Sequence, residues 1–280
     1  MEQPTHPRLA ALVARARECA ASEGAPRVGI VYPGDALALD AALSMLDAGI
    51  ATPVLIGPRL GIARAAEVAG VDLRRFELIG TADVPAEAAL RATTLARSGD
   101  LQALMKGSLH TDELMSAIVN KATGLRGSTR ISHAFLFDLP RYPKLLALAD
   151  CVVNIAPHLP AKRDILTNAV RLLQALGIAQ PKVAIVTAVE TVNPAIPATL
   201  DAQALVELAK QGAWSGAIVE GPFGFDNAIS AEAARIKKIT SSVPGDADLL
   251  LMPDLNAGNM LYKSFNYIGG GDCAGLVLGA

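Results

Sequence analysis

The sequence predicts an α/β protein with two α/β domains, mostly parallel sheets and a cleft between the domains. Hydrophobic residues make up 51% of the 280 residues but aromatic residues only 4%, so Ala, Val, Leu and Ile must supply most of the core. Such a composition suits helices packed on parallel sheets better than an aromatic-rich β-sandwich. Short apolar runs also alternate with amphipathic helical segments along the chain, which is typical of βαβ units.

The first part of the chain contains one series of these units. Residues 5–22 have a helical pattern, and the apolar run 27–32 ends at a Pro-Gly breaker, which predicts a buried strand. Asp35 is placed to cap a helix over 36–48. Further strands are predicted at 53–57, 76–79 and 101–105, with a helix at 85–98.

A second series follows residue 130. Its predicted strands are 133–138, 151–155, 183–187, 216–219 and 248–252, and its predicted helices are 163–176, 201–210, 231–238 and 257–267. The polar, glycine-containing segment 123–130 separates the two series. We therefore predict a first domain over 1–130, to which residues 276–280 return, and a second domain over 131–275. A cleft near the boundary is the expected binding site, because ligands gather at strand carboxyl ends and between domains.

Composition excludes several classes of protein. The chain has 25 basic and 27 acidic residues, a formal net charge of −2, whereas a general nucleic-acid binder has a basic excess. No apolar run approaches the ~18–20 residues that cross a bilayer, and the first residues lack the order of a signal peptide. The three cysteines are far apart and form no CxxC motif, which fits reduced thiols. We expect a cytoplasmic protein that binds neither nucleic acid nor a membrane.

Common catalytic and nucleotide-binding motifs are absent from the sequence. It contains no Walker A loop, no HExxH and no GxSxG. One GxGxxA match, at Gly269, Gly271 and Ala274, follows a predicted helix instead of a strand, so it is interpreted as a turn. No cluster of His, Asp or Glu has the spacing of a metal site, and no metal is predicted.

The segment from Lys106 to Thr111 is a candidate anion site. It follows a predicted strand and starts a helix, so it combines an ammonium group, hydroxyls and free backbone N–H groups. The alternative is an ordinary strand–helix turn in which Thr111 or Ser108 caps the helix. The candidate residues here are Lys106, Ser108, His110 and Thr111.

Two arginines, Arg126 and Arg130, lie at the predicted domain boundary. Arginines can bind phosphate groups through paired hydrogen bonds. The alternative is a solvated surface segment.

Polar residues also follow three successive predicted strands of the second domain. They are Glu190, Asn193, Asp226, Asn227, Asn256 and Asn259. Because the strands are parallel, these residues should meet at one edge of the sheet and form a site for a polar ligand. The alternative for Asp226 is a helix cap. Next to Asn256, Ala257 and Gly258 are small enough to allow a ligand to approach the backbone.

Four segments resemble the phosphate acetyl/butyryltransferase family. They are KGSLHTDELM (106–115), ETVNP (190–194), EGPFGFDNAISAEAA (220–234) and PDLNAGNMLYK (253–263). The resemblance runs from about residue 25 to the end of the chain. It is closer to the phosphate butyryltransferase branch, because phosphate acetyltransferases usually have an arginine at the position that matches Met115.

The resemblance implies a two-domain fold related in architecture to isocitrate dehydrogenases. It also implies that the cleft binds CoA or acyl-CoA and phosphate or acyl phosphate, with Lys106, Ser108, Asp226, Asn227, Asn256 and Asn259 as cleft or substrate-site candidates. The implied reaction is reversible transfer of a butyryl or acetyl group between CoA and phosphate, by direct attack of the CoA thiol on acyl phosphate. CoA is then a substrate, no cofactor or metal is required, and the protein is a homo-oligomer, at least a dimer.

One departure from the family concerns the chain end. Family members continue past the strand that matches residues 276–279 into a segment with a Ser-Arg pair and an acidic residue, to which central catalytic roles are assigned. This chain stops at Ala280, so we assign no catalytic residue and expect that the chain is truncated. Two alternative functions remain open: a metal- and NAD(P)-dependent dehydrogenase on the related fold, and a non-catalytic CoA-binding protein.

Overall fold

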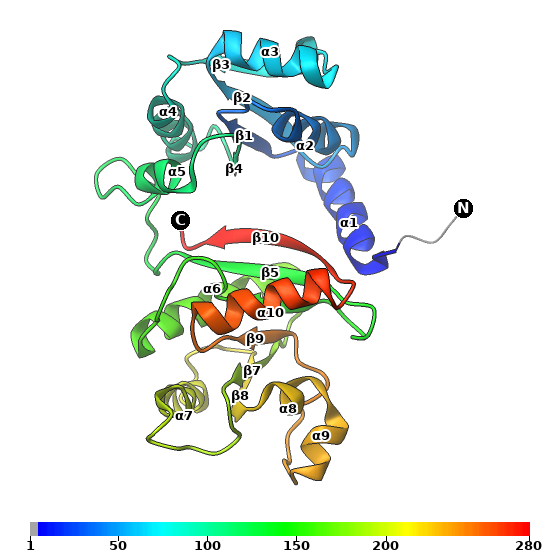
Figure 1. Ribbon diagram of the computed structural model, residues 1–280, viewed down its shortest axis with the longest axis vertical. Helices are drawn as coiled ribbons and strands as arrows, with labels where there is room; N and C mark the ends of the chain where they lie inside the picture. The colour runs from blue at the N-terminus through cyan, green and yellow to red at the C-terminus, as the bar shows by residue number, and fades with distance from the viewer. Residues whose placement is uncertain (1–4) are drawn as a thin grey trace. The chain divides into compact units, whose positions relative to one another are not determined.

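The computed structural model describes residues 5–280, and the chain folds into two compact units (Figure 1). The N-terminal unit holds residues 11–126, and the C-terminal unit holds residues 127–279 together with residues 5–10. Between residues 5 and 280, six strand pairs are parallel and two are antiparallel. The prediction of an α/β protein with mostly parallel sheets is confirmed.

The N-terminal unit is built on a four-stranded parallel sheet with the order β3-β2-β1-β4. Its strands are β1 (Arg27–Val31), β2 (Thr52–Gly57), β3 (Glu77–Gly80) and β4 (Ala103–Lys106). Its helices are α2 (Ala36–Asp47), α3 (Arg59–Ala69), α4 (Pro85–Arg97) and α5 (Thr111–Ile118), with α1 (Pro7–Glu23) before β1 and a short 3-10 helix, η1 (Leu73–Arg75), after α3.

Helices cover both faces of this sheet (Figure 1). Leu39 of α2 and Ile62 of α3 pack with Ile30 and Leu55 of the central strands. Helix α4 contacts β1, β2 and β4, and the residues it buries are small: Ala88, Ala89, Ala92 and Thr93. Small side chains bring this helix close to the strands, which explains how the unit builds a core with few aromatic rings.

The C-terminal unit is built on a six-stranded sheet with the order β10-β5-β6-β9-β7-β8. Its strands are β5 (Ser132–Asp138), β6 (Leu146–Ala149), β7 (Lys182–Val186), β8 (Ile218–Phe223), β9 (Leu249–Leu251) and β10 (Asp272–Leu278). Its helices are α6 (Leu159–Ala175), α7 (Pro197–Lys210), α8 (Phe225–Ile229), α9 (Ala231–Ile236) and α10 (Leu255–Tyr267). Strands β6, β9, β7 and β8 are parallel to one another, while β5 is antiparallel to both of its neighbours.

The two faces of β5 contact different helices, because successive side chains of a strand point to opposite faces. Asn168 of α6 donates a hydrogen bond to the Ser132 hydroxyl at 2.9 Å. On the other face, the ring of Phe135 stacks on Tyr262 of α10 with centroids 4.5 Å apart. The unit is therefore a three-layer arrangement, with α6 and α10 on opposite sides of the sheet (Figure 1).

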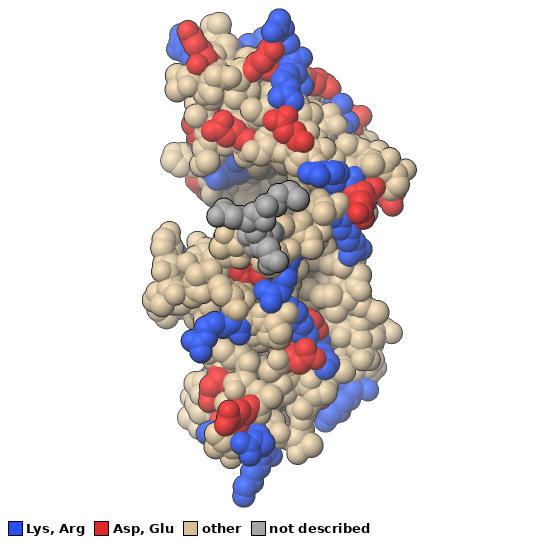
Figure 2. All heavy atoms as spheres, turned by 90° about the vertical axis from the view of Figure 1, so that its right-hand side faces the viewer, with Lys and Arg blue, Asp and Glu red and all other residues tan. Residues whose placement is uncertain are grey.

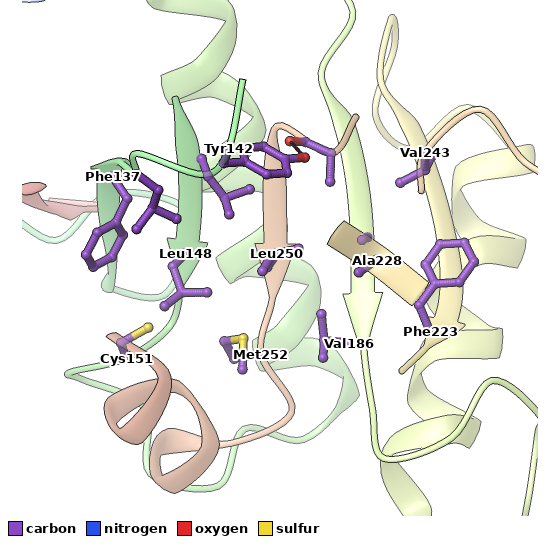
Figure 3. Packing of buried hydrophobic residues seen from close by; sticks show 14 residues of the cluster. Phe137, Tyr142, Leu148, Cys151, Val186, Phe223, Ala228, Val243, Leu250 and Met252 are labelled. Atoms are coloured by element: carbon purple, nitrogen blue, oxygen red, sulfur yellow. Dashed lines mark hydrogen bonds between the residues drawn. The ribbon is translucent and has the colours of Figure 1, made fainter. Parts of the chain in front are cut away.

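The core beneath α10 joins neighbouring strands through apolar side chains (Figure 3). Phe137 of β5, Leu148 of β6 and Leu250 of β9 are each fully buried within it. The Tyr142 hydroxyl lies in the same cluster and donates a hydrogen bond to the carbonyl of Ala247 at 2.8 Å, so its polar atom is satisfied.

One predicted strand differs from the structure, and one helix of the structure was not predicted. Residues 151–155 form a loop, and the strand lies earlier, at β6, so the prediction of a strand over 151–155 is wrong. The reason is local: the Asp150 carboxylate accepts hydrogen bonds from the N–H groups of Val152 and Val153, which turns the chain out of the sheet. Helix α3 was not expected, and its N-cap residue is Pro58, which provides no side-chain cap.

The first turn of α1 and the strand β10 both contact β5. Residues 276–280 were predicted to return to the first domain, but β10 pairs with β5 from Asp272 opposite Asp138 to Leu278 opposite Ser132. This seven-residue ladder places residues up to Gly279 in the C-terminal unit, so the predicted return of this segment to the first domain is wrong. Asp138 also forms an ion pair with Arg8 at 2.6 Å and accepts the backbone N–H of Arg8 at 2.7 Å. These bonds hold the first turn of α1 in the C-terminal unit.

On the face shown in Figure 2, Lys and Arg side chains are interspersed with Asp and Glu, and neither sign of charge dominates. Within the described residues, none of the helices combines the length and apolar character that a bilayer span requires.

Helix α2 provides a matched test of the N-terminal core, because Leu39 is fully buried and Leu37 is 79% exposed. We expect Leu39→Ala to lower the free energy of unfolding by about 2–5 kcal/mol, since it removes buried methyl groups and leaves a cavity. Leu37→Ala should change it by less than about 0.5 kcal/mol. Urea unfolding monitored by circular dichroism measures both; equal effects would contradict the packing described here.

Candidate functional site

The site residues predicted from sequence lie in both units, at the edges where parallel strands end. In the N-terminal unit, Lys106 ends β4 and the following turn leads into α5. That turn lies beside the turn between β1 and α2, because Gly107 and Ser108 donate backbone hydrogen bonds to the carbonyls of Val31 and Tyr32 at 2.8 Å each. A Cβ on Gly107 would lie 2.5 Å from the Val31 oxygen, so only glycine fits at this position.

Ser108 joins the two turns through its side chain. Its hydroxyl donates to Asp35 Oδ2 at 2.8 Å and accepts the N–H of Gly34 at 2.9 Å. Asp35 Oδ1 in turn accepts the N–H of Ala38 at 2.8 Å, which confirms the prediction that Asp35 caps α2. The hydrogen bonds from Ala38 and Ser108 hold the pKa of the Asp35 carboxyl below its ordinary value, and Lys106 adds a smaller electrostatic effect in the same direction.

The ammonium group of Lys106 lies over its own turn. Its Nζ donates to the carbonyl of Leu109 at 2.9 Å and to that of Gly107 at 3.1 Å. An ammonium has three N–H donors, so within residues 5–280 one of them has no acceptor. This group is therefore fixed in place and still able to donate to an anion.

His110 and Thr111 are both exposed at the start of α5. His110 occupies the N-cap position, and its backbone N–H donates to Glu113 Oε2 at 2.8 Å. The alternative in which Thr111 or Ser108 caps this helix is wrong, since Thr111 is already helical and Ser108 is bonded to Asp35.

Sequence reasoning missed Tyr32 in this group. It is a non-glycine residue with φ of 56°, a conformation in which bulky side chains are strained. Its hydroxyl donates to Asp83 Oδ1 at 2.6 Å, and this bond raises the pKa of the phenol. A tyrosine placed between a buried strand and a Pro-Gly pair was the signal that could have identified it.

Arg126 and Arg130 fall in different units, on either side of the boundary at residues 126 and 127. Arg126 is exposed and forms no hydrogen bond or ion pair with the rest of the described chain. Arg130 is also exposed, but two hydrogen bonds hold it. Its Nε donates to Asn154 Oδ1 at 2.6 Å, and its backbone N–H donates to Asp164 Oδ2 at 3.0 Å. Arg130 is thus the more firmly held of the two guanidinium groups.

Glu190 belongs to a charged cluster at the end of β7 and β8. Lys237 donates to Glu190 Oε1 at 2.8 Å, and this bond lowers the pKa of the carboxyl. The hydrogen bond to Glu190 is also the main reason that the pKa of Lys237 is raised, and Asp226 adds a smaller electrostatic effect. Asn193 is not part of this cluster: its side chain accepts the N–H of Ala195 at 2.9 Å and forms the turn before α7.

Asp226 and Asn227 both lie in α8, whose N-cap residue is Gly224, so the alternative of Asp226 as the cap is wrong. Asn227 is 1% exposed; its Nδ2 donates to Asp226 Oδ2 at 3.3 Å, while its Oδ1 has no hydrogen-bond partner among the described residues. A Cβ on Gly224 would approach Asp226 Oδ1 to 2.8 Å, so a larger residue at this position would displace the Asp226 carboxylate.

Asn256 and Asn259 lie in the first half of α10, which Asp254 caps by accepting the N–H of Ala257 at 3.0 Å. Asn256 is exposed, while Asn259 Nδ2 donates to the carbonyl of Cys151 at 3.2 Å. Gly258 was expected to allow the approach of a ligand. The chain itself makes that approach, since a Cβ on Gly258 would lie 2.6 Å from the Asp150 carbonyl oxygen.

A groove of about 600 Å³ runs along the outer strand β8 and is lined in part by Glu190, Glu220 and Phe223. Sequence reasoning did not predict it. Within residues 5–280, no three His, Cys, Asp or Glu residues are arranged to bind a metal ion, which is the feature that the dehydrogenase alternative needs.

Comparison with known proteins gives consistent results. The family model described as phosphate acetyl/butaryl transferase matches residues 82–280. The chain is 48% identical over 264 residues to the phosphate acetyltransferase of Rhizobium meliloti, covering 93% of this chain and 83% of that protein. It is 36% identical to the phosphate butyryltransferase of Clostridium acetobutylicum, covering 90% and 84%. The crystal structure of a branched-chain phosphotransacylase from Enterococcus faecalis matches with a TM-score of 0.79 at 28% identity, covering 91% of this chain and 88% of that chain.

The Ser108–Asp35 hydrogen bond can be tested by titration. A carboxyl whose folded pKa is lowered stabilises the fold above its ordinary pKa of 3.8, and this contribution is lost as pH falls through the folded pKa. We expect Ser108→Ala to raise the pKa of Asp35 toward 3.8, measured by NMR of the side-chain carboxyl carbon. Ser22→Ala is the control, because the Ser22 hydroxyl bonds only carbonyls of its own helix. An unchanged Asp35 titration in Ser108→Ala would refute the assignment.

The close approach at Gly258 predicts that Gly258→Ala destabilises the protein. In the interior of a helix, alanine is more stable than glycine by about 1 kcal/mol, but overpacking costs about 1–3 kcal/mol. Because the 2.6 Å contact is with a backbone atom that cannot rotate away, we expect an overpacking cost at the upper end of this range, about 3 kcal/mol, and hence a net loss of about 2 kcal/mol in the free energy of unfolding. Ser264→Ala, at an exposed position of the same helix, should change it by less than about 0.5 kcal/mol. Urea denaturation of both variants provides the comparison.

Proposed function

The chain belongs to the phosphate acetyl/butyryltransferase family and is an acyltransferase, and we propose that it catalyses the reversible reaction acyl-CoA + phosphate ⇌ acyl phosphate + CoA. The observation that carries the proposal is the match to relatives named for this type of transfer over about nine-tenths of the chain. CoA is a substrate in this proposal, and the protein needs no further cofactor.

The proposed chemistry is direct transfer between two anionic substrates. In the direction that consumes acyl phosphate, the CoA thiol loses its proton, its sulfur bonds to the carbonyl carbon, and the bond from that carbon to the phosphate oxygen breaks. Phosphate leaves without a covalent acyl-enzyme. The protein must hold the two substrates in line, accept the thiol proton, and stabilise the carbonyl oxygen and the departing phosphate with hydrogen-bond donors.

Several groups are suited to the binding part of this chemistry. Lys106 has a free N–H at the end of β4, and Arg130 presents a guanidinium at the end of β6. The exposed amide of Asn256 lies at the start of α10, which follows β9. We propose these three as substrate-binding groups; positive charge and amide donors match phosphate and carbonyl oxygens.

We propose a preference for butyryl over acetyl groups. The support is Met115, an apolar and partly buried side chain at a position where phosphate acetyltransferases usually have arginine. Relatives named for both acyl groups match the chain, so both thioesters belong in the assay.

We also propose a homo-oligomer, at least a dimer, that works in the cytoplasm. The three cysteines, Cys19, Cys151 and Cys273, are free thiols, which supports a reducing compartment.

The proposed activity is tested by mixing the protein with butyryl-CoA and phosphate and following thiol release. We expect release that depends on phosphate, with kcat/KM higher for butyryl-CoA than for acetyl-CoA by about 10–200-fold, the range that small differences in acyl length produce. A reaction without phosphate is the control. If neither butyryl-CoA nor acetyl-CoA gives phosphate-dependent thiol release, the proposed reaction is refuted.

The same preparation separates the alternatives. Binding of CoA in a calorimeter without turnover would favour a non-catalytic CoA-binding protein. Metal-stimulated reduction of a nicotinamide nucleotide with a hydroxyacid would favour the dehydrogenase.

A further inference from the structure

Arg130 lies at the edge of the larger sheet where its parallel strands end. Strand β5 is antiparallel to β6, and Ala134 of β5 pairs with Ala149, the last residue of β6. Residues before β5 therefore lie beyond the end of β6, on the side where β9, β7 and β8 also end. In open α/β sheets, this edge is where ligands bind.

Asp150 is the first residue after β6 and is only 3% exposed. Its Oδ1 accepts the N–H groups of Val152 and Val153 at 2.8 and 3.0 Å. Its Oδ2 accepts the Nδ2 group of Asn154 at 2.6 Å and the N–H of His133 at 3.3 Å. A buried carboxylate requires such donors, and these four fix both the loop 150–155 and the side chain of Asn154.

Asn154 is 4% exposed, and its orientation follows from its neighbours. Its Nδ2 donates to Asp150 Oδ2 at 2.6 Å and to the carbonyl of Ile131 at 3.0 Å. A flipped amide would place its oxygen against both acceptors, so Oδ1 must point the other way. There it accepts the Nε–H of Arg130 at 2.6 Å.

The guanidinium of Arg130 is thus held by one of its three nitrogens. Its two Nη groups form no hydrogen bond or ion pair with any side chain or carbonyl of residues 5–280. The backbone of Arg130 is fixed as well, because its N–H donates to Asp164 Oδ2 at 3.0 Å and its carbonyl accepts Asn168 Nδ2 at 2.9 Å.

Helix α10 supports the loop 150–155 from the other side. Asn259 donates to the Cys151 carbonyl at 3.2 Å, and the N–H of Leu255 donates to the Ile155 carbonyl at 3.0 Å. Hydrogen bonds therefore fix the loop 150–155 at several points. Because Asn154 belongs to this loop, the bond from Arg130 to Asn154 fixes the guanidinium as well.

We propose that Asp150 and Asn154 are positioning residues that direct the two Nη groups of Arg130 at a phosphate group of a substrate. The inference rests on the proposed function, in which both substrates carry phosphate. Arginine binds phosphate oxygens with two parallel hydrogen bonds, which requires a fixed orientation of its plane. The phosphate is that of inorganic or acyl phosphate, or that of CoA, and the two sources are distinguished by which KM changes.

The test compares Arg130→Ala, Asn154→Ala and the double variant, with kcat and KM measured separately for phosphate and for butyryl-CoA. We expect Arg130→Ala to raise one of the two KM values by about 10–100-fold, the size expected when a charged hydrogen bond is lost. Asn154→Ala should raise the same KM by a smaller factor, with kcat changed less than KM. The double variant should match Arg130→Ala, because Asn154 acts through Arg130. Three results would overturn the proposal: a KM increase in the double variant equal to the product of the two single increases, a change in the other KM with Asn154→Ala, or KM values that do not change.

A structural variant and a rescue experiment separate positioning from loss of stability. Asp201→Asn breaks the ion pair with the buried Lys162 in the same unit (2.7 Å), so it should lower the melting temperature without changing either KM. Ethylguanidinium added at millimolar concentration should restore part of the lost affinity in Arg130→Ala but not in the double variant, which lacks the Asn154 oxygen. Equal rescue in both would overturn the role of Asn154.

A failure of the proposed function is recognised independently of these variants. If the wild-type protein shows no phosphate-dependent thiol release, the reaction is wrong, and calorimetry with inorganic phosphate and with CoA then tests the positioning. Weaker binding of one probe by both single variants supports the proposal. Equal affinity in wild type and variants, or no binding of either probe to the wild type, overturns it.

Discussion

The buried carboxylate of Asp150 determines how the chain leaves the centre of the larger sheet. Two of its hydrogen bonds close the turn after β6, one reaches the backbone of β5, and one reaches Asn154. A carboxylate at this depth requires hydrogen-bond donors, and four N–H groups supply them. The loop 150–155 and the start of β5 are therefore arranged around a single side chain, and α10 contacts that loop through Asn259 and Leu255.

In the N-terminal unit, a serine hydroxyl has a similar role at the ends of two strands. Two turns leave parallel strands at the same edge, and the Ser108 hydroxyl joins them by donating to Asp35 and accepting from Gly34. Asp35 also caps α2, the helix that follows β1. The position of Ser108 in the turn after β4 therefore fixes the residue at which α2 begins. In both units, a short polar side chain at a strand end organises the backbone around it, and a cationic group lies nearby.

Much of the fold was predictable because it is recorded in local patterns. Apolar runs marked β1, β2, β5 and β7, and Asp35 marked the start of α2. The strand predicted at 151–155 failed for a physical reason, since Cys151, Val152 and Val153 are typical strand residues that a side chain elsewhere in the loop turns outward. The candidate residues Arg130 and Asn259 were visible in the sequence, but their partners were not. Asn154 contacts Arg130 and Cys151 contacts Asn259 through the tertiary fold, and no spacing rule relates residue 130 to residue 154 or residue 151 to residue 259.

Because Cys151 is buried, its reaction with a thiol reagent can report the opening of the loop 150–155. The thiol is fully buried, lies against Gly258, and has a pKa raised by burial, while its backbone carbonyl accepts the Asn259 bond. A thiol reagent can reach it only when the loop separates from α10, whereas the exposed Cys19 reacts without any opening. The ratio of the two labelling rates is therefore a measure of how often the loop 150–155 opens in the native protein, on the timescale of local unfolding.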